Sequence, residues 1–541
     1  MTLSTDLRNS KNPKIESRYQ KSPSSTNSIP MSLTKLAPAY RQLYQNAAPP
    51  ASIVHLGVGN FFRSHLNFIT HLALEKSDDA TLLQNNWSIH GLGLLNHSSE
   101  IDLHQALHTQ SYLYSLLQLP SGTVDVVGAL SGLSHTQQQV SGLEESLRYL
   151  SQPSTKIISM TVTEKGYHQA NDGGLDFNAA DIQHDLDKLS RRTVRDVSSL
   201  FPLRTPIGTL VAGLALRKHV DVGNGESVTM LCCDNLPHNG NVLKRLIHDM
   251  SSAVDSELSE WITQSVSFPN SMVDRITPAA DDATKGRVQQ VLGKSDAVCR
   301  APVQCEDFYQ WVVEDNFVAG RPAWETVEHV VFVDDVTQFE NMKQFENMKL
   351  RLLNGSHTAL SYISSLLFLY EEEDKYVTVD RVMRDADVER FVRQYMNEVK
   401  PTLNGGPEGE KKLDDYCDSL VERFNNQDIS DQVSRLCQDG SKKFQGFVVP
   451  PLSEMMSQGA DTRMIQKVVA SWYVYLREWK GTVDDPSGLD LLQLAKDGKL
   501  KEFLARGIGS VGTNEEWVRG VERQVKRLND VGPRAFLQQD V

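Results

Sequence analysis

The stretch Ile53-Val54-His55-Leu56-Gly57-Val58-Gly59-Asn60-Phe61-Phe62-Arg63-Ser64-His65 decides the fold, because it joins an apolar run to two glycines and a helical pattern. A short apolar run is typical of a buried strand, and the helical pattern continues to about Leu74. At such a junction, glycines let backbone amides approach a pyrophosphate, and the amino end of the helix adds partial positive charge. The stretch therefore predicts a dinucleotide-binding α/β unit.

The candidate cofactor-binding residues of this stretch are Gly57, Gly59, Phe61 and Arg63. Phe62 stands where the usual fingerprint has its third glycine. For that reason the segment alone also fits an ordinary glycine turn between a strand and a helix. Arg63 has two interpretations as well, a cation near the phosphates or a partner in a surface salt bridge.

The two halves of the chain differ in pattern. Strand-like runs alternate with helical runs up to about residue 265, which indicates a parallel sheet, whereas helical runs dominate from about Thr337 onward. We expect an α/β, Rossmann-type N-terminal domain over residues 31–265 and a mainly α-helical C-terminal domain over residues 266–541, with the boundary open between 265 and 335. Residues 1–30 are rich in serine and poor in apolar residues, which predicts a disordered tail.

Composition argues against several classes of function. The chain has 541 residues and a formal net charge of −14, and negative charge repels the phosphate backbone of nucleic acids. No apolar stretch reaches the ~20 residues that span a bilayer. Six cysteines without a C-x-x-C pair are too sparse for a disulfide scaffold and argue against a cysteine zinc site. We expect a cytoplasmic protein without a nucleic-acid or membrane partner.

The segment Lys349-Leu-Arg-Leu-Leu-Asn354-Gly-Ser-His357 carries three polar groups on an expected helix. At ~100° per residue, Lys349, Asn354 and His357 fall within an arc of ~140°. A lysine, an amide and an imidazole on one partly buried face can bind a hydroxyl and move its proton. The alternative is a solvated polar stripe on an amphipathic helix.

Asn235 and Asp274 are two further candidates outside that helix. Asn235 follows the strand-like run 227–233, and ligands bind in the loops at the carboxyl ends of α/β strands. Its amide suits a substrate oxygen, and it equally suits a helix N-cap. Asp274 suits a polyol hydroxyl, and it also suits an ion pair with Arg275 or a turn cap.

Together these segments resemble the polyol-specific long-chain dehydrogenases, which form the mannitol dehydrogenase family. The match covers about residues 50–510 and rests on six ordered blocks of sequence. The blocks are Gly57–His65, Thr163–Tyr167, Asp234–Gly240, Phe268–Pro278, Cys305–Trp324 and Lys349–His357. The length of the chain and the segment 315–324 resemble the mannitol 2-dehydrogenase branch.

The resemblance implies a zinc-independent, NAD(P)-dependent oxidoreductase that interconverts a sugar alcohol and a ketose, with D-mannitol and D-fructose as the expected pair. It implies no metal site, a small-molecule polyol or ketose as partner, and a monomer. It also assigns roles to six residues. Lys349 is the acid–base, Asn235 and Asn354 form an oxyanion hole, and Glu346 belongs to a proton path. His357 orients the substrate, and Asp274 binds substrate hydroxyls. Lysine must be neutral to accept a proton, so its surroundings must lower its pKa from ~10.4.

One departure from the family pattern is a tandem duplication. Residues 338–343 read Gln-Phe-Glu-Asn-Met-Lys, and residues 344–349 repeat this sequence, so the chain has six extra residues. Counted back from Asn354, Lys349 keeps the register of the motif and Lys343 is the displaced copy. We expect the extra unit to be absorbed before residue 344.

A second departure concerns the cofactor. NAD-preferring enzymes place an acid at the end of the second strand, against the ribose hydroxyls. Here the run Trp87–Leu94 is followed by Leu-Asn-His-Ser-Ser, and the first acid is Glu100. NAD is the expected cofactor, and the use of NADP stays open.

Two alternatives for the function stay open. The first keeps the chemistry and changes the substrate, as in a uronate reductase acting on fructuronate or tagaturonate, or an arabinitol or sorbitol dehydrogenase. A uronate needs a cation for its carboxylate, and the sequence does not show whether Arg435 or Lys443 points inward. The second alternative is a non-catalytic cofactor-binding protein in which the duplication has displaced the helix.

Overall fold

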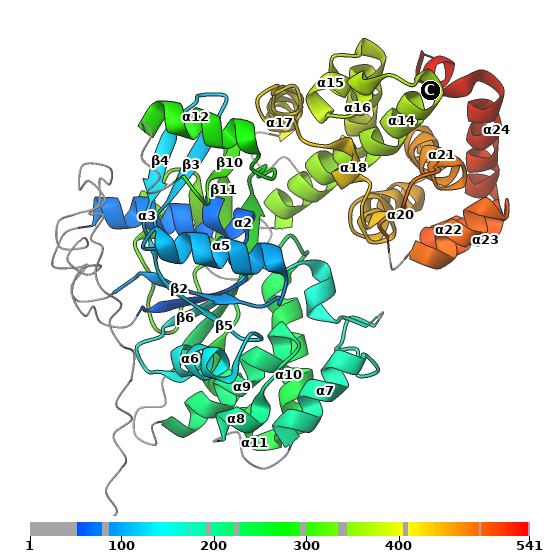
Figure 1. Cartoon of the computed structure of the whole chain (residues 1–541). Coiled ribbons are helices and arrows are strands. Elements are labelled where there is room, and N and C mark those ends of the chain that lie inside the picture. The colour runs from blue at the N-terminus through cyan, green and yellow to red at the C-terminus, as the bar shows by residue number, and fades with distance from the viewer. Residues whose placement is uncertain are drawn as a thin grey trace, which may run out of the picture.

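The computed structural model describes residues 51–77, 86–170, 172–190, 196–220, 227–292, 299–333, 343–403, 409–485 and 488–538. The expected tail (residues 1–30) and residues 338–342 of the first repeat copy lie outside the described residues. The chain forms an α/β lobe and a helical lobe (Figure 1), so the predicted fold class is confirmed. Strands continue to Val333 and helices follow from residue 343, and we propose to place the domain boundary between these positions.

A six-stranded parallel sheet forms the centre of the α/β lobe, in the order β5-β2-β1-β6-β7-β8. Its strands are β1 (Ile53–Leu56), β2 (Ile89–Gly93), β5 (Leu130–His135), β6 (Ile157–Met160), β7 (Val228–Cys232) and β8 (Val266–Ser267). All four residues of β1 are buried, as expected for a central parallel strand that helices cover on both faces.

Helices cover both faces of this sheet because successive strand residues point to opposite sides. Val54 of β1 packs in one core with helices of one layer, and Ile53 packs in another core with helices of the opposite layer. The first layer includes α6 (Val140–Ser151), α7 (Ala180–Ser190), α8 (Val197–Leu200), α9 (Pro206–Val220), α10 (Asn239–Val254) and α11 (Ser256–Ser265). The second includes α2 (Asn60–Ser64), α3 (Leu66–Lys76) and α5 (Ser98–Thr109).

Two small sheets extend the α/β lobe toward the helical lobe. One has the order β10-β3-β4 and the other β12-β11-β9. Their strands are β3 (Tyr114–Leu119), β4 (Val124–Val127), β9 (Ser271–Asp274), β10 (Val303–Glu306), β11 (Gln310–Glu314) and β12 (Val330–Val333), with α12 (Asp282–Leu292) beside the first sheet (Figure 1). Asp274 and Glu306 are the last residues of their strands, which places two carboxylates at this edge.

The helical lobe is built around α14 (Gly355–Glu371), which runs from the middle of the molecule into the lobe (Figure 1). It packs with α16 (Ala386–Val399), α21 (Arg463–Glu478) and α24 (Glu515–Gln538) in one apolar core. The remaining helices are α15 (Val379–Met383), α17 (Gly409–Phe424), α18 (Val433–Leu436), α19 (Gly440–Lys443), α20 (Val449–Ser457), α22 (Leu489–Lys496) and α23 (Leu500–Gly507).

The segment that carries the lysine motif is not a regular α-helix. Residues 343–348 are α-helical, Lys349–Asn354 form a π-helix, and α14 begins at Gly355. A π-helix is wider than an α-helix, so the ~140° arc expected from a regular helix is wrong for this motif. Such π-turns are rare and occur frequently at functional sites.

Among the described residues, no helix combines the length and the apolar character that crossing a bilayer requires.

Candidate active site

A cavity of about 370 Å³ lies where the two lobes meet. Its walls bring together six candidates that the sequence spreads over more than a hundred positions. They are Phe61, Asn235, Asp274, Lys349, Asn354 and His357, and Arg435 and Lys443 line the same cavity. The carboxyl ends of the parallel strands supply one wall and the lysine helix supplies the other, which is the usual place for a ligand in an open α/β sheet.

Lys349 is the amine of this cavity and is only 8% exposed. Its Nζ donates hydrogen bonds to Oδ1 of Asn235, at 2.5 Å, and to the carbonyl oxygen of Val273. Burial lowers the pKa of Lys349 to about 8, with Asp274 opposing this shift and Arg423 adding to it. A large part of the lysine population is therefore neutral near pH 8 and can accept a proton.

Asn235 is oriented by Lys349. An ammonium group can only donate, so the amide oxygen of Asn235 faces Lys349 and its NH₂ group is left as a donor. The preceding residue, Asp234, holds the loop in place by accepting hydrogen bonds from Val162 N, at 2.7 Å, and from the Tyr167 hydroxyl, at 2.5 Å. Burial raises the pKa of Asp234 to about 7. Tyr167 and Asp234 belong to two of the matched sequence blocks, and the structure brings these blocks together.

Asp274 is bound by an arginine that the sequence did not single out. Arg423 of α17 donates from Nη1 and Nη2 to the two carboxylate oxygens of Asp274, at 3.0 Å each. Burial alone would raise the pKa of Asp274, but the charges of Arg423 and Lys349 outweigh it and hold the pKa below its usual value. The expected alternative partner, Arg275, instead donates to the Ser64 and Glu306 carbonyl oxygens.

His357 and Asn354 complete the wall on the helical side. The His357 ring stacks on Phe424 with 4.2 Å between ring centroids and a 28° angle between planes. Burial lowers the pKa of His357 to about 3, so the imidazole is neutral at physiological pH. Asn354, at the end of the π-helix, is 8% exposed and lines the cavity.

Glu346 lies one turn before Lys349 and contacts the loop after Asn235. Its Oε1 accepts a hydrogen bond from the backbone N–H of His238 at 2.8 Å, and its Oε2 lies 3.7 Å from His238 Nδ1. Burial raises the pKa of Glu346. The His238 side chain is 43% exposed, so the Glu346–His238 pair reaches from the interior to the surface.

The glycine turn suits a pyrophosphate. Gly57 has φ +93°, and a Cβ there would lie 2.1 Å from the carbonyl oxygen of Thr161, so only glycine fits. At Gly59 a Cβ would meet no atom within 4 Å, which leaves open space above the turn that precedes α2. Phe61 lies at the cavity wall and stacks on His65 with 5.1 Å between ring centroids.

Arg63 does not occupy either of its expected places. It is 2% exposed, and its guanidinium donates to the carbonyl oxygen of Ala301, at 2.7 Å, and to Asn60 Oδ1, at 2.6 Å. The group also lies 5.4 Å from the centroid of the Tyr114 ring. We correct the expectation on this point, because Arg63 braces the interior of the α/β lobe and is neither a phosphate ligand nor part of a surface salt bridge.

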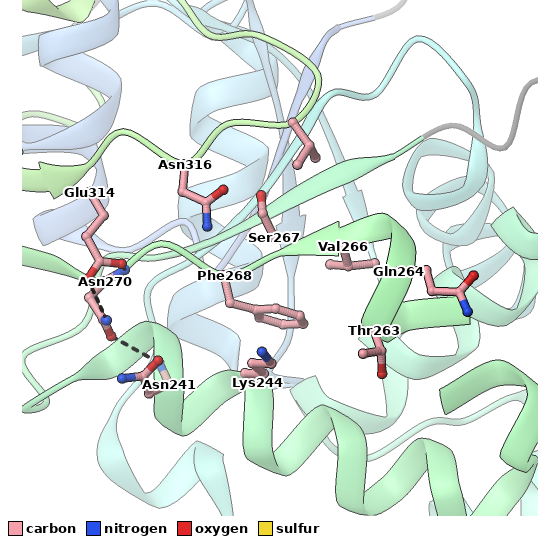
Figure 2. A pocket seen from close by; sticks show the side chains of 11 residues that line it. Asn241, Lys244, Thr263, Gln264, Val266, Ser267, Phe268, Asn270, Glu314 and Asn316 are labelled. Atoms are coloured by element: carbon pink, nitrogen blue, oxygen red, sulfur yellow. Dashed lines mark hydrogen bonds between the residues drawn. The ribbon is translucent and has the colours of Figure 1, made fainter. Parts of the chain in front are cut away.

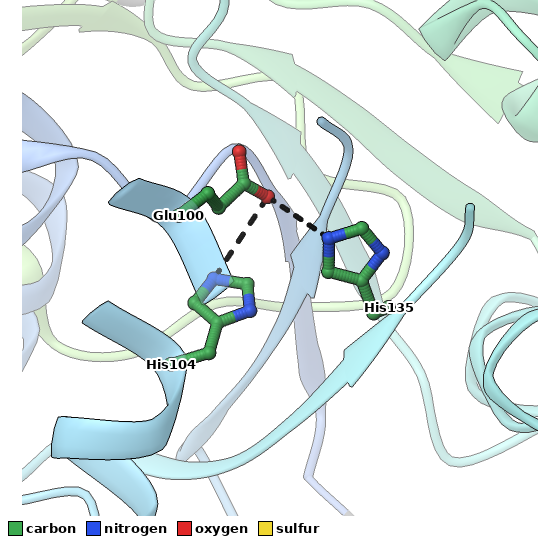
Figure 3. A group of neighbouring side chains, drawn as sticks. All are labelled: Glu100, His104 and His135. Atoms are coloured by element: carbon green, nitrogen blue, oxygen red, sulfur yellow. Dashed lines mark ion pairs between the residues drawn. The ribbon is translucent and has the colours of Figure 1, made fainter. Parts of the chain in front are cut away.

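Glu100, the first acid after β2, belongs to a cluster with His104 and His135 (Figure 3). The Oε1 atom of Glu100 accepts hydrogen bonds from Leu94 N, at 2.8 Å, and Leu95 N, at 3.2 Å. His135 Nδ1 accepts from Gln137 N at 3.2 Å, so His135 Nε2 carries the proton that it directs to the Leu95 carbonyl at 2.9 Å. A protonated nitrogen has no lone pair for a metal. The cluster therefore acts as a brace at the end of β2.

A second cavity of about 450 Å³ lies in the α/β lobe beside β8 and α10 (Figure 2). Polar side chains surround Phe268 there, and Asn241 N donates to Asn270 Oδ1 at 3.0 Å. None of the residues lining it is a candidate from the sequence. The cavity between the lobes is therefore the better candidate for the active site.

The comparisons with known proteins show the family of this chain. Residues 51–326 match the mannitol dehydrogenase Rossmann domain, and residues 341–527 match the mannitol dehydrogenase C-terminal domain. The structure of Pseudomonas fluorescens mannitol 2-dehydrogenase in a ternary complex with NAD and D-mannitol has a TM-score of 0.77 and 34% identity, and the match covers 94% of this chain and 98% of that one.

Two further relatives carry names other than mannitol 2-dehydrogenase. The D-mannonate oxidoreductase of Escherichia coli is 33% identical over 470 residues, which cover 86% of this chain and 87% of that enzyme. The polyol:NADP oxidoreductase of Gluconobacter oxydans is 35% identical over 430 residues, which cover 79% of this chain and 80% of that enzyme. Both domains and nearly the whole described chain are thus matched, and the chain belongs to the mannitol dehydrogenase family of polyol oxidoreductases.

Proposed function

We propose that this chain is a zinc-independent dehydrogenase that interconverts D-mannitol and D-fructose with a nicotinamide cofactor. The observation that carries the proposal is the buried Lys349 amine, hydrogen-bonded to Asn235 at 2.5 Å on the wall of the cavity between the lobes. The solved relative with D-mannitol and NAD supports this choice of substrate. We also propose, from the family resemblance, that the enzyme works as a monomer.

The proton of the substrate hydroxyl goes to Lys349 in its neutral form. As negative charge develops on the substrate oxygen, the NH₂ groups of Asn235 and Asn354 donate hydrogen bonds to it. One well-placed donor of this kind stabilises the transition state by roughly 3–4 kcal/mol. Glu346 and His238 then offer the proton a way from Lys349 to solvent.

Asp274 and His357 orient the rest of the substrate. The carboxylate of Asp274 gives one acceptor site on each oxygen to Arg423, which leaves further lone pairs for substrate hydroxyls. The neutral imidazole of His357, held by Phe424, can donate to or accept from a hydroxyl without adding charge.

The open turn at Gly59 fits the pyrophosphate of a dinucleotide, with Gly57 shaping the turn and Phe61 beside it. When bound, the nicotinamide supplies the acceptor for the hydride. No acid directly follows β2: the first one, Glu100, lies on α5, where its Oε1 accepts hydrogen bonds from the backbone amides of Leu94 and Leu95. We therefore propose that both NAD and NADP are used, in line with the NADP-linked name of one relative.

A uronate reductase is the second candidate, because two cations line the cavity. Lys443 Nζ donates to the Leu436 carbonyl oxygen at 2.9 Å, and Arg435 Nε donates to Asp431 Oδ1 at 2.7 Å. Asp431 compensates the charge of Arg435, and burial together with Arg435 lowers the pKa of Lys443. Both effects weaken the attraction for a carboxylate, which favours a neutral polyol.

Parallel assays test the proposal. The full-length protein is given fructose, fructuronate, tagaturonate and sorbose, each with NADH and with NADPH, and Lys349→Ala serves as the control. We expect fructose to have the highest kcat/KM. A higher value for a uronate would favour the second candidate, and tight NADH binding by fluorescence titration without any turnover would indicate a non-catalytic cofactor-binding protein.

A further inference from the structure

Arg423 reaches from the last turn of α17 to two buried carboxylates of the α/β lobe. Besides its two bonds to Asp274, it donates from Nε and Nη2 to Glu306, at 2.9 and 2.8 Å. The side chains of Arg423, Asp274 and Glu306 are only 9%, 4% and 3% exposed. The guanidinium also lies 4.4 Å from the centroid of the Phe308 ring. A planar fork with this many fixed partners is held in one position.

The end of β9 holds both Arg423 and Lys349. The carbonyl oxygen of Val273 accepts from Lys349 Nζ, and the carboxylate of the next residue, Asp274, binds Arg423. Two cations from separate helices of the helical lobe therefore meet adjacent residues of one strand. The charge of Asp274 is shared between them, and Arg423 takes the larger part through two hydrogen bonds.

The charged groups that face Lys349 come from several elements. Asp274 on β9 and Glu346 on its own helix favour the charged amine, and Arg423 on α17 disfavours it. His65, before α3, also faces this region, and it is neutral because burial lowers its pKa to about 3. Arg423 is thus the cation that offsets the nearby acids.

Two further titratable groups lie on the far side of Asp274. Glu306 is the other acid, and burial raises its pKa although Arg423 opposes this. Tyr416, also near Asp274, is kept neutral because burial raises its pKa. Without Arg423, the charge of Asp274 would act on Lys349 uncompensated, because Arg423 and Lys349 are the two cations that lower the pKa of Asp274 most.

We propose that Arg423 is a positioning residue that neutralises the Asp274 and Glu306 carboxylates and thereby keeps Lys349 in the proton state that the reaction needs. The proposal deepens the proposed function and rests on it, since it concerns the same amine. The proposal also explains why the partner of Asp274 is a cation. A neutral donor would hold Asp274 in place, but the negative charge of Asp274 would then act on Lys349.

Competitive acetylation of the full-length protein tests this without a substrate. Trace acetic anhydride is applied between pH 6 and pH 11, and the acetylation of Lys349 is read by peptide mass spectrometry. The neutral amine is the form that reacts, so the midpoint of the profile reports its titration. In the wild type we expect a midpoint near 8.

Three variants separate charge from mere packing. Arg423→Gln should raise the Lys349 midpoint by about one to three pH units, so that labelling at pH 8 falls at least about fivefold. Arg423→Lys keeps the charge and should stay near the wild-type midpoint. The double variant Arg423→Gln with Asp274→Asn removes both charges and should return the midpoint toward the wild-type value.

Arg287→Gln is the matched control. Arg287 on α12 pairs with Asp428 of the helical lobe at 2.8 Å, so it is also an arginine–aspartate contact between the lobes, but it is 46% exposed and is not part of the cavity wall. It should leave the Lys349 midpoint unchanged. An Arg423→Gln protein with a lowered Tm but an unmoved midpoint would overturn the proposal, because Arg423 would then be a structural clamp alone.

The kinetic readout separates this proposal from the proposed function. With an active wild type, Arg423→Gln should move the pH profile of polyol oxidation upward together with the acetylation midpoint. If the wild type has no turnover on any polyol or ketose, the proposed function fails, while the acetylation profiles still decide the role of Arg423. If Arg423→Gln does not fold, as judged by circular dichroism, a folded Arg423→Lys must keep the wild-type midpoint, and a shifted midpoint would overturn the proposal.

Discussion

The Nζ of Lys349 lies 2.5 Å from Oδ1 of Asn235, although the two residues are 114 positions apart and belong to different lobes. The contact orients both groups at once. The amine is held at the cavity wall, and the amide is turned so that its NH₂ group remains a donor. The acid–base and one donor for the substrate oxygen are therefore positioned before any substrate binds.

Lys349→Ala should lower kcat for polyol oxidation by about 100-fold to 10,000-fold, which is the range that a positioned acid–base contributes. Lys343 is the equivalent lysine of the first repeat copy, and it is exposed at the surface. Lys343→Ala should therefore keep the wild-type rate. Steady-state kinetics of the two variants check this, and the opposite outcome would show that the first copy supplies the base.

Asn235→Ala should lower kcat by about 100-fold to 1,000-fold, because it removes a donor to the developing negative charge. Binding of the cofactor should change little, since Asn235 belongs to the substrate cavity. Kinetics with mannitol and a fluorescence titration with NADH separate the two effects. A variant with unchanged kcat and a raised KM would instead indicate a role in ground-state binding.

The two directions of the reaction should have opposite pH dependence. Burial, with the charge of Arg423, lowers the pKa of Lys349 to about 8 although Asp274 opposes this. Oxidation needs the neutral amine, so its kcat/KM should rise as the pH passes upward through about 8. Reduction needs the protonated amine, so its kcat/KM should fall over the same interval. Profiles recorded from pH 6 to pH 10 check the sign, and parallel profiles for the two directions would contradict it.

Gly57→Ala and Gly59→Ala form a matched pair at the glycine turn. At Gly57 a Cβ would lie 2.1 Å from a carbonyl oxygen and φ is +93°, so we expect a loss of stability of about 1–3 kcal/mol. At Gly59 the added methyl group meets nothing within 4 Å, so the Tm should stay near the wild-type value. The methyl group would still fill space above the turn, and the Kd for NADH should rise. Thermal unfolding and fluorescence titration distinguish the two variants.

An acid placed after β2 should restore selectivity for NAD. The wild type has Leu95-Asn96-His97 at this point, and Glu100 is engaged by backbone amides. Asn96→Asp should lower kcat/KM with NADP by tenfold or more and change the value with NAD much less, because a carboxylate repels the 2′-phosphate. Equal losses with both cofactors would show that residue 96 does not face the ribose.

The parts of the fold that follow a local pattern were predictable from the sequence. The apolar run at residues 53–56 coincides with β1, and the helical runs expected from about Thr337 onward are present as helices such as α21, because apolar periodicity decides both. The strand β5 was not recognised, since its sequence Leu-Ser-Gly-Leu-Ser-His has few β-branched or aromatic residues. The π-helix at Lys349–Asn354 was also missed, because no sequence period distinguishes it from an α-helix.

The candidate site was predictable only as far as its motifs reach. The blocks around Asn235 and Lys349 carry their own signal, and the structure brings them together as the resemblance implies. Arg423 has no motif around it, and its partner Asp274 is 149 positions away, so no local pattern connects them. The expectation for Arg63 was wrong because a local pattern was present but did not decide its role. A cation next to a glycine turn suggests a phosphate ligand, whereas only the tertiary structure shows that Arg63 has buried partners.

The contacts of β9 with two helices of the helical lobe determine how substrate can enter the cavity. Swinging the lobes apart would pull Lys349 from Val273 and Arg423 from Asp274 in the same movement, leaving charged groups in the interior without partners. We therefore expect the enzyme to keep one closed shape through the whole turnover cycle, with sugars passing through the mouth of the cavity. Crystals of the protein should accordingly survive soaking with polyols without cracking.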